Sequence, residues 1–151
     1  MTTSTSQAQR ALRTNAGTLT IDVDVLLTGS GILVGNVRNL GRIDVGGVGL
    51  AGTLTVQGNF EQGDTGVVNI EVGGPLLAQF DRILVSGTAT LGGTLNTALI
   101  NNFLPSFETF PFMTFANRIG SFAITNLEPG GGVIFTLLPN PTGLTLATNR
   151  L

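Results

Sequence analysis

Carboxylates are the only side chains in this sequence that could act as acid–base catalysts. The chain has nine Asp and Glu residues but no His and no Cys, and all seven basic residues are Arg rather than Lys. A Ser–His or Cys–His nucleophile and a lysine Schiff base are therefore excluded. Two carboxylates could still flank a glycosidic bond, but the Tyr and Trp rings that commonly stack on sugars are absent. We predict no catalytic residues and no enzyme activity.

A closely spaced acidic pair, Asp22-Val23-Asp24, raises the question of metal binding. On a strand, residues i and i+2 point to the same side, so both carboxylates would share one face. Calcium needs about six to eight oxygen ligands, and the glycine-aspartate nonapeptide of calcium-binding β-rolls does not occur. We interpret the pair as solvated charges that discourage edge pairing, and Asp81-Arg82 beside Glu71 as surface charge. No metal site is predicted.

Neither the glycines nor the threonines indicate a ligand site. The glycine clusters precede strands and turns rather than helices, so we predict no phosphate-binding loop and no cofactor. Three Thr-x-Thr pairs are similar to the threonine ladders of ice-binding solenoids, but intermediate strands would place Arg, Asp, Asn and Glu outward, and strand propensity explains the threonines better. The three pairs are Thr18/Thr20, Thr53/Thr55 and Thr88/Thr90.

These residues are carried by short alternating segments, of which residues 52–95 give the clearest example. Apolar and polar side chains alternate there with a period of two, the pattern of half-buried strands. Glycine pairs end several of these patterns, as turns with positive φ require. The sequence predicts an all-β fold with the following inward residues: Leu54, Val56, Val68, Ile70, Ile83 and Val85.

An internal repeat predicts how the strands are arranged. The segment GTLTI at residues 17–21 recurs as GTLTV at 52–56 and GTATL at 87–91, and both offsets (52 − 17 and 87 − 52) are 35. A weaker echo, GSFAI, lies at residues 120–124. Self-similarity at a fixed spacing of this size indicates stacked repeats. We predict a short right-handed β-solenoid of stacked strands.

The last third of the chain changes character. Five of the nine Phe residues lie within residues 103–115, interrupted by Pro105 and Pro111. Because the end of a solenoid exposes apolar side chains and unpaired strand edges, we expect this Phe-rich terminal segment to act as a cap. Two further strands are predicted at residues 133–138 and 144–147, joined by the turn Pro139-Asn140-Pro141.

Length and charge limit the domain organisation and the partners. A chain of 151 residues is long enough for one domain with a core. The net charge of −2 leaves no basic surface for nucleic acid, and no apolar run is long enough for a membrane-spanning helix. Residues 1–9 are polar and do not resemble a secretory signal. We expect residues 1–16 to be a flexible or intersubunit arm and 17–151 a single β-solenoid domain.

In their order along the chain, these segments resemble a known module. Residues 54–60, 68–74, 80–87, 91–95 and 110–115 are similar to the β-solenoid stalk repeats of autotransporter-like bacterial surface adhesins and related secreted proteins. The resemblance covers about residues 52–127. It implies a secreted or cell-surface bacterial protein. Because such modules usually belong to far longer chains, it also implies that length is made by assembling copies.

The sequence therefore predicts a structural, non-catalytic extracellular protein that self-associates head to tail into a filament or surface assembly. Its main partners would be copies of itself, since a heterologous contact that does not close produces a filament. Two alternatives remain open: a monomeric stalk fragment of a surface adhesin, and a carbohydrate-binding module with cell-surface glycans as partners.

Overall fold

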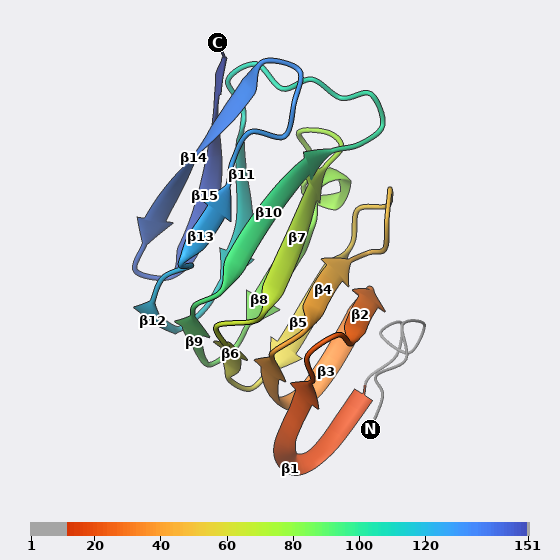
Figure 1. Ribbon diagram of the computed structural model, residues 1–151, viewed down its shortest axis with the longest axis vertical. Coiled ribbons are helices and arrows are strands. Elements are labelled where there is room, and N and C mark those ends of the chain that lie inside the picture. Colours follow the sequence, from red (N-terminus) through yellow and green to blue (C-terminus); the bar gives the residue numbers. More distant parts are fainter. Residues whose placement is uncertain (1–11, 151) are drawn as a thin grey trace.

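The computed structural model describes residues 12–150, and their side chains from Gly17 to Asn149. Strands wind into a β-solenoid of about four turns with stacked parallel strands. The described residues contain no α-helix, only the short 3-10 helix η2 (Leu77–Gln79). Figure 1 shows the turns following one another from the N-terminal to the C-terminal end. The predicted all-β solenoid is confirmed.

Each turn contributes strands to three faces, and strands of adjacent turns pair in parallel. The first face holds the beginnings of β1 (Leu12–Ile21) and β3 (Gly31–Asn39), then β5 (Thr53–Gln57), β8 (Arg82–Val85) and β11 (Thr109–Thr114). The second face holds the ends of β1 and β3, then β6 (Phe60–Gln62), β9 (Thr88–Leu91) and β12 (Asn117–Gly120). The third face is a separate sheet of β2 (Leu26–Gly29), β4 (Arg42–Val45), β7 (Val67–Val72), β10 (Thr94–Leu99) and β13 (Ile124–Asn126).

The core lies between the three faces and is made by inward rows of apolar side chains. On the first face Leu33 aligns with Val56, and Val56 aligns with Val85. On the third face Leu27, Ile43, Val68 and Leu95 align in the same way. The six inward residues predicted from the alternation are all buried, so this prediction is confirmed.

The turns of the solenoid do not follow the 35-residue spacing of the sequence repeat. Aligned residues of the third-face row Leu27, Ile43, Val68 and Leu95 are separated by 43 − 27 = 16, 68 − 43 = 25 and 95 − 68 = 27 residues. The GT-x-T segments at residues 17–21 and 87–91 lie on the second face, whereas the one at 52–56 lies on the first. The motif repeats because each strand follows a glycine corner, while the loops between faces set the length of each turn.

Glycines at the corner between the first and second faces allow the turns to stack. A Cβ on Gly58 would lie 2.2 Å from the Gly35 carbonyl oxygen, a distance no side chain tolerates. The neighbouring asparagines bridge the turns. The Asn59 backbone N–H donates to Asn36 Oδ1 at 2.9 Å, and the Thr88 N–H donates to Asn59 Oδ1 at 2.9 Å. Stacking at about 4.8 Å per turn leaves room only for such a corner.

Two buried amides join the turns at the corner between the second and third faces. Asn39 Nδ2 donates to Gln62 Oε1 at 2.7 Å and to the Val67 carbonyl oxygen at 3.1 Å. Gln62 Nε2 donates to the Thr94 carbonyl oxygen at 3.2 Å. Because the amides find these partners, their burial in the core does not leave polar groups unsatisfied.

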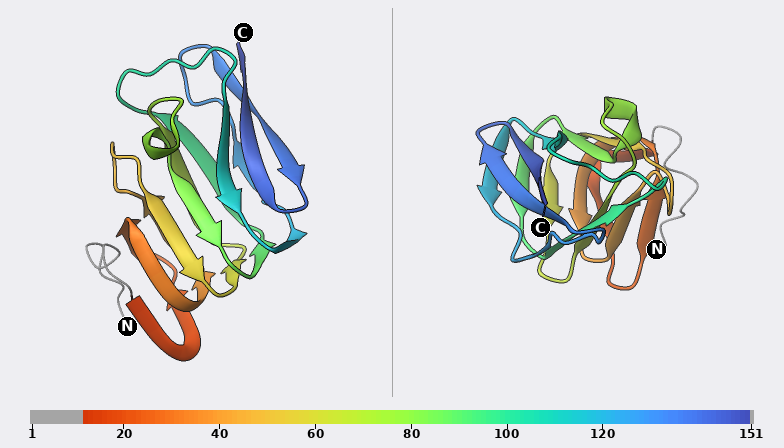
Figure 2. Two further views of the ribbon diagram at one scale, coloured as in Figure 1. Left: turned by 180° about the vertical axis from the view of Figure 1, so that it is seen from behind. Right: turned by 90° about the horizontal axis from the view of Figure 1, so that it is seen from above.

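A C-terminal hairpin closes the first face. Strands β14 (Val133–Asn140) and β15 (Gly143–Arg150) pair antiparallel, and β15 pairs antiparallel with β11. Figure 2 shows both strands beyond β11 at the end of the column. The two predicted strands are present and longer than expected, so that only Pro141 and Thr142 separate them.

Phe rings fill the space beneath this hairpin. Phe110 contacts three other rings edge to face, with centroid distances of 5.3 Å to Phe80, 6.2 Å to Phe103 and 6.0 Å to Phe135. The predicted Phe-rich terminal segment is therefore confirmed, and its rings come from three different parts of the chain.

The predicted arm at residues 1–16 lies mostly outside the described residues. Its last five residues belong to β1, where Leu12 aligns with Leu33 of β3. Within residues 12–150, no helix is long and apolar enough to cross a membrane.

Replacing Phe110 by Ala tests the cap. Phe110 is fully buried, so its removal should lower the free energy of unfolding by about 3–5 kcal/mol. The matched control is Phe107→Ala, because Phe107 is 82% exposed and should change stability by less than about 0.5 kcal/mol. Urea unfolding of dilute protein measures both, and equal effects would contradict a packing role for the cap.

Candidate functional site

The most continuous polar feature of the structure is a row of side chains on the third face, one from each of its five strands. Thr28 aligns with Asp44, Asp44 with Asn69, Asn69 with Asn96, and Asn96 with Asn126. We call these five residues the polar row. The strands place them together because the inward residues next to them, such as Ile43 and Val68, stack in register in the core.

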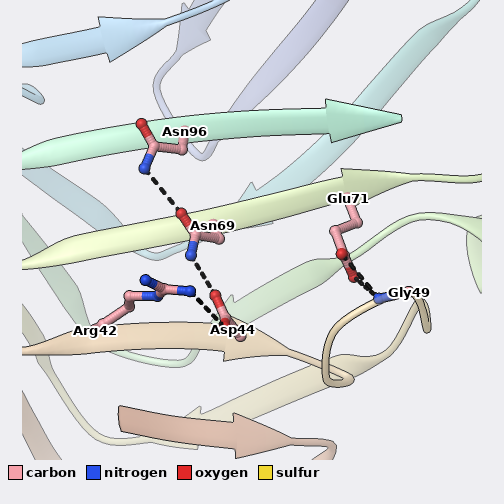
Figure 3. A network of polar contacts seen from close by, with 6 residues as sticks. All are labelled: Arg42, Asp44, Gly49, Asn69, Glu71 and Asn96. Atoms are coloured by element: carbon pink, nitrogen blue, oxygen red, sulfur yellow. Dashed lines mark hydrogen bonds and ion pairs between the residues drawn. The ribbon is translucent and has the colours of Figure 1, made fainter. Parts of the chain in front are cut away.

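The amides of the polar row form a directional chain of hydrogen bonds. Asn126 Nδ2 donates to Asn96 Oδ1 at 2.5 Å, Asn96 Nδ2 donates to Asn69 Oδ1 at 2.9 Å, and Asn69 Nδ2 donates to Asp44 Oδ1. Figure 3 shows the part of this chain from Asn96 to Asp44. Every amide points its donor toward the N-terminal end, so the chain ends on a carboxylate.

Asp44 is the charged end of the chain. It is only 5% exposed, and its second oxygen, Oδ2, accepts a hydrogen bond from Arg42 Nη2 at 3.3 Å. The next member of the row, Thr28, has a buried hydroxyl oxygen with no hydrogen-bond partner among the described residues. Both oxygens of Asp44 are thus engaged by neighbours within the protein.

Two further carboxyl groups hold the loop at residues 46–52, which joins the third face to the first. The Glu71 carboxylate accepts the Gly49 N–H at 2.9 and 3.2 Å, as Figure 3 shows. Asp81 is fully buried; its Oδ1 accepts the Gly52 N–H at 2.9 Å and its Oδ2 the Glu71 N–H at 2.8 Å. These bonds tie β5, β7 and the approach to β8 together at one corner.

Burial governs the protonation of both groups. Loss of hydration raises the pKa of Asp81 to about 8, against the backbone hydrogen bonds that favour the ionised form. Burial likewise raises the pKa of Glu71, and the charge of Asp44 adds to the effect. Asp81 is thus a structural carboxyl group closed off from solvent, rather than an accessible acid.

A shallow hollow of about 180 Å³ lies over the polar row, lined in part by Asp44, Asn69, Glu71 and Asn96. The oxygens of Asp44 and Glu71 that face this region already accept hydrogen bonds from Asn69, Arg42 and Gly49. Within residues 12–150, no three acidic side chains gather closely enough to hold a metal ion. The arrangement is suited to holding turns in register, because the side chains from Asp44 to Asn126 are hydrogen-bonded from one turn to the next.

The acidic pair Asp22 and Asp24 does not lie on a strand. Asp22 and Asp24 are in the turn between β1 and β2, where the Val25 N–H donates to the Asp22 carbonyl oxygen at 3.0 Å and Asp24 has φ 70°. The prediction of a shared strand face is therefore wrong, because the chain changes direction there.

The prediction that Asp81 is surface charge is also wrong. The corner between the third and first faces presents two backbone N–H groups to it, and these replace water. The only sequence signal was the position of Asp81 between Phe80 and the inward residue Ile83.

The threonine pairs do not form a ladder. Thr18/Thr20 and Thr88/Thr90 lie on the second face, and Thr53/Thr55 on the first. The two turns between the second-face pairs carry Arg38 and Glu61, which form an exposed ion pair at 3.5 Å.

Comparison with known proteins adds no assignment. No protein-family model matches this chain, and no curated protein matches it. The resemblance to adhesin stalk repeats therefore stays a prediction.

Replacing Asn69 by Asp tests the chain of hydrogen bonds. The new carboxylate would lose the donor to Asp44 and place two negative charges side by side. We expect the free energy of unfolding at pH 7 to fall by about 1–3 kcal/mol. The control is Asn126→Asp at the exposed end of the row. Equal effects of both substitutions at pH 7 would contradict the proposed geometry.

The buried carboxyl of Asp81 makes stability depend on pH. Its pKa is about 8 in the folded chain against an ordinary value of 3.8, so between these values the folded state binds one more proton than the unfolded state. Asp81 therefore contributes fully to the free energy of unfolding below pH 3.8. This contribution is lost as pH rises toward about 8, by up to about 1.4 kcal/mol per pH unit. The raised pKa of Glu71 acts in the same direction.

Urea unfolding between pH 4 and pH 8 measures this dependence. In Asp81→Asn, whose side chain cannot ionise, the free energy of unfolding should change less with pH. The unmodified chain alone can contradict the prediction: its free energy of unfolding would then rise between pH 5 and pH 7.

Proposed function

We propose that this chain is a structural, non-catalytic protein that self-associates by joining strand edges at the ends of its solenoid. The observation that carries the proposal is that the sheet of the third face has an unpaired strand edge at each end. Among the described residues, β2 pairs only with β4 and β13 pairs only with β10. Unpaired strand edges are templates for another chain, and these two edges lie at opposite ends of one parallel sheet.

The open edge of β13 offers a defined set of backbone groups. The Ile124 N–H donates to the Gly93 carbonyl oxygen, toward β10. Because successive residues of a parallel strand bond to alternate sides, the Thr125 N–H and C=O point away from β10. Strand β2 of a second copy would pair there in the same direction as every other strand of the third face.

The surface at this end also favours association. Ile119 on β12 and Ile124 on β13 are exposed, and the chain contains no Lys to guard an edge by charge. The polar row reaches this edge at Asn126, whose Oδ1 receives no donor among the described residues. Because β15 covers β11 on the first face, the contact would use the second and third faces.

A secreted or bacterial cell-surface location is part of the proposal, and it rests on the resemblance alone. A second candidate is a monomeric terminal unit of an adhesin stalk. It is favoured by polar residues at inward positions of the last turn: Arg118 aligns with Ala89, and Thr125 with Leu95. Such residues suit the end of a column that faces water.

Replacing Thr125 by Pro distinguishes the two candidates. Proline removes the N–H that points to the open side, without removing a hydrogen bond to β10. If the edge joins copies, sedimentation of the unmodified chain should show assemblies far larger than 15.6 kDa, and Thr125→Pro should remove them. The control Thr125→Ala keeps the N–H and should still assemble. An unmodified chain that shows no end-to-end assembly would support the terminal unit.

A further inference from the structure

Three loops at the corner between the third and first faces expose large apolar side chains. The loops are residues 46–52, 73–81 and 100–108, and Figures 1 and 2 show them protruding beyond the strands on one side of the molecule. Each carries two exposed side chains, and we call the six together the apolar ridge: Val48, Leu50, Leu76, Leu77, Leu104 and Phe107. Consecutive turns place the three loops beside one another.

The backbone of the three loops that carry the ridge is held in place. A carboxylate or amide side chain accepts backbone N–H groups at each tip. Glu71 accepts the Gly49 N–H, between Val48 and Leu50. Gln79 Oε1 accepts the Leu76 N–H at 3.0 Å. Glu108 Oε1 accepts the N–H groups of Ser106 at 2.7 Å and Phe107 at 3.2 Å.

This fixation is what a binding surface requires. A loop whose backbone is already held in place loses less conformational entropy when it binds. Val48 is 80% exposed and Phe107 is 82% exposed, so no part of the described chain covers these two side chains.

The ridge is large enough for a contact between two copies of the chain. Six large apolar side chains expose on the order of 500 Å² of apolar surface, near the upper end for the largest patch of a monomer. Two ridges facing each other would bury on the order of 1,000 Å², the lower limit of a specific interface. The three loops contain no basic residue, so they lack the cations that would attract an anionic lipid surface.

We propose that the apolar ridge packs against the same ridge of a second copy about a two-fold axis, giving a lateral dimer. The contact extends the proposed self-association and rests on it for its purpose, but it uses a surface distinct from the strand edges. A chain with both surfaces forms paired columns, since the edges lie at the ends and the ridge along one side.

The experiment uses Thr125→Pro as a background in which end-to-end joining is blocked. Sedimentation equilibrium of this variant should show a dimer. Adding Val48→Ser and Phe107→Ser should raise the dimer Kd by at least about 100-fold. Val23→Ser with Leu138→Ser is the matched control, because both residues are exposed and belong neither to the ridge nor to the β12 and β13 end, and it should leave the dimer intact. Circular dichroism checks that each variant is folded.

Several outcomes would overturn the proposal. These are a monomeric Thr125→Pro background, a dimer that survives the two ridge substitutions, and a monomer that instead binds neutral phosphatidylcholine vesicles through the ridge. An unmodified chain that stops at a ridge-dependent dimer would disprove end-to-end assembly and leave the lateral contact standing. If the unmodified chain forms long assemblies that the ridge substitutions do not affect, and Thr125→Pro is a monomer, the lateral dimer is disproved and end-to-end assembly stands.

Discussion

The structure depends on hydrogen bonding between turns. In a stack of parallel strands the backbone partners of one turn lie in the turns above and below it, about 4.8 Å away. Little hydrogen bonding is available within a turn, so no turn is stable alone. This requirement explains why inward side chains such as Val56 and Val85 are aligned, and why a Cβ at Gly58 would meet the Gly35 carbonyl oxygen.

Each corner meets the same requirement with different side chains. Asn36 and Asn59 bond the next turn from outside the first corner, whereas Asn39 does so from inside the second. At the third corner Asp81 joins two elements through backbone N–H groups. The polar residues described at these three corners therefore join neighbouring turns or elements, in keeping with the structural role proposed above.

The sequence predicted what depends on local alternation and missed what depends on the spacing between turns. Inward residues such as Ile70 and Ile83 follow from a period of two, and the Phe-rich cap follows from composition. The polar row was not predictable, because variable loops separate Asp44, Asn69 and Asn96 by unequal numbers of residues. The burial of Asp81 could not be predicted either, since its two donors come from Gly52 and Glu71, which only the fold brings together.

The uniform direction of the amide chain has a consequence for how such a chain can lengthen. Asn69 and Asn96 each donate toward the N-terminal end and accept from the C-terminal end, so one can follow another without limit. If the segment from Asn69 to Asn96 were duplicated, the chain would gain a turn whose asparagine donor and acceptor already match those of its neighbours. If the segment from Asp44 to Asn69 were duplicated, the second Asp44 would follow an asparagine. That asparagine would present its Oδ1 acceptor, rather than a donor, to the carboxylate. Growth by gene duplication is thus compatible with the middle of the column and disfavoured at its charged end.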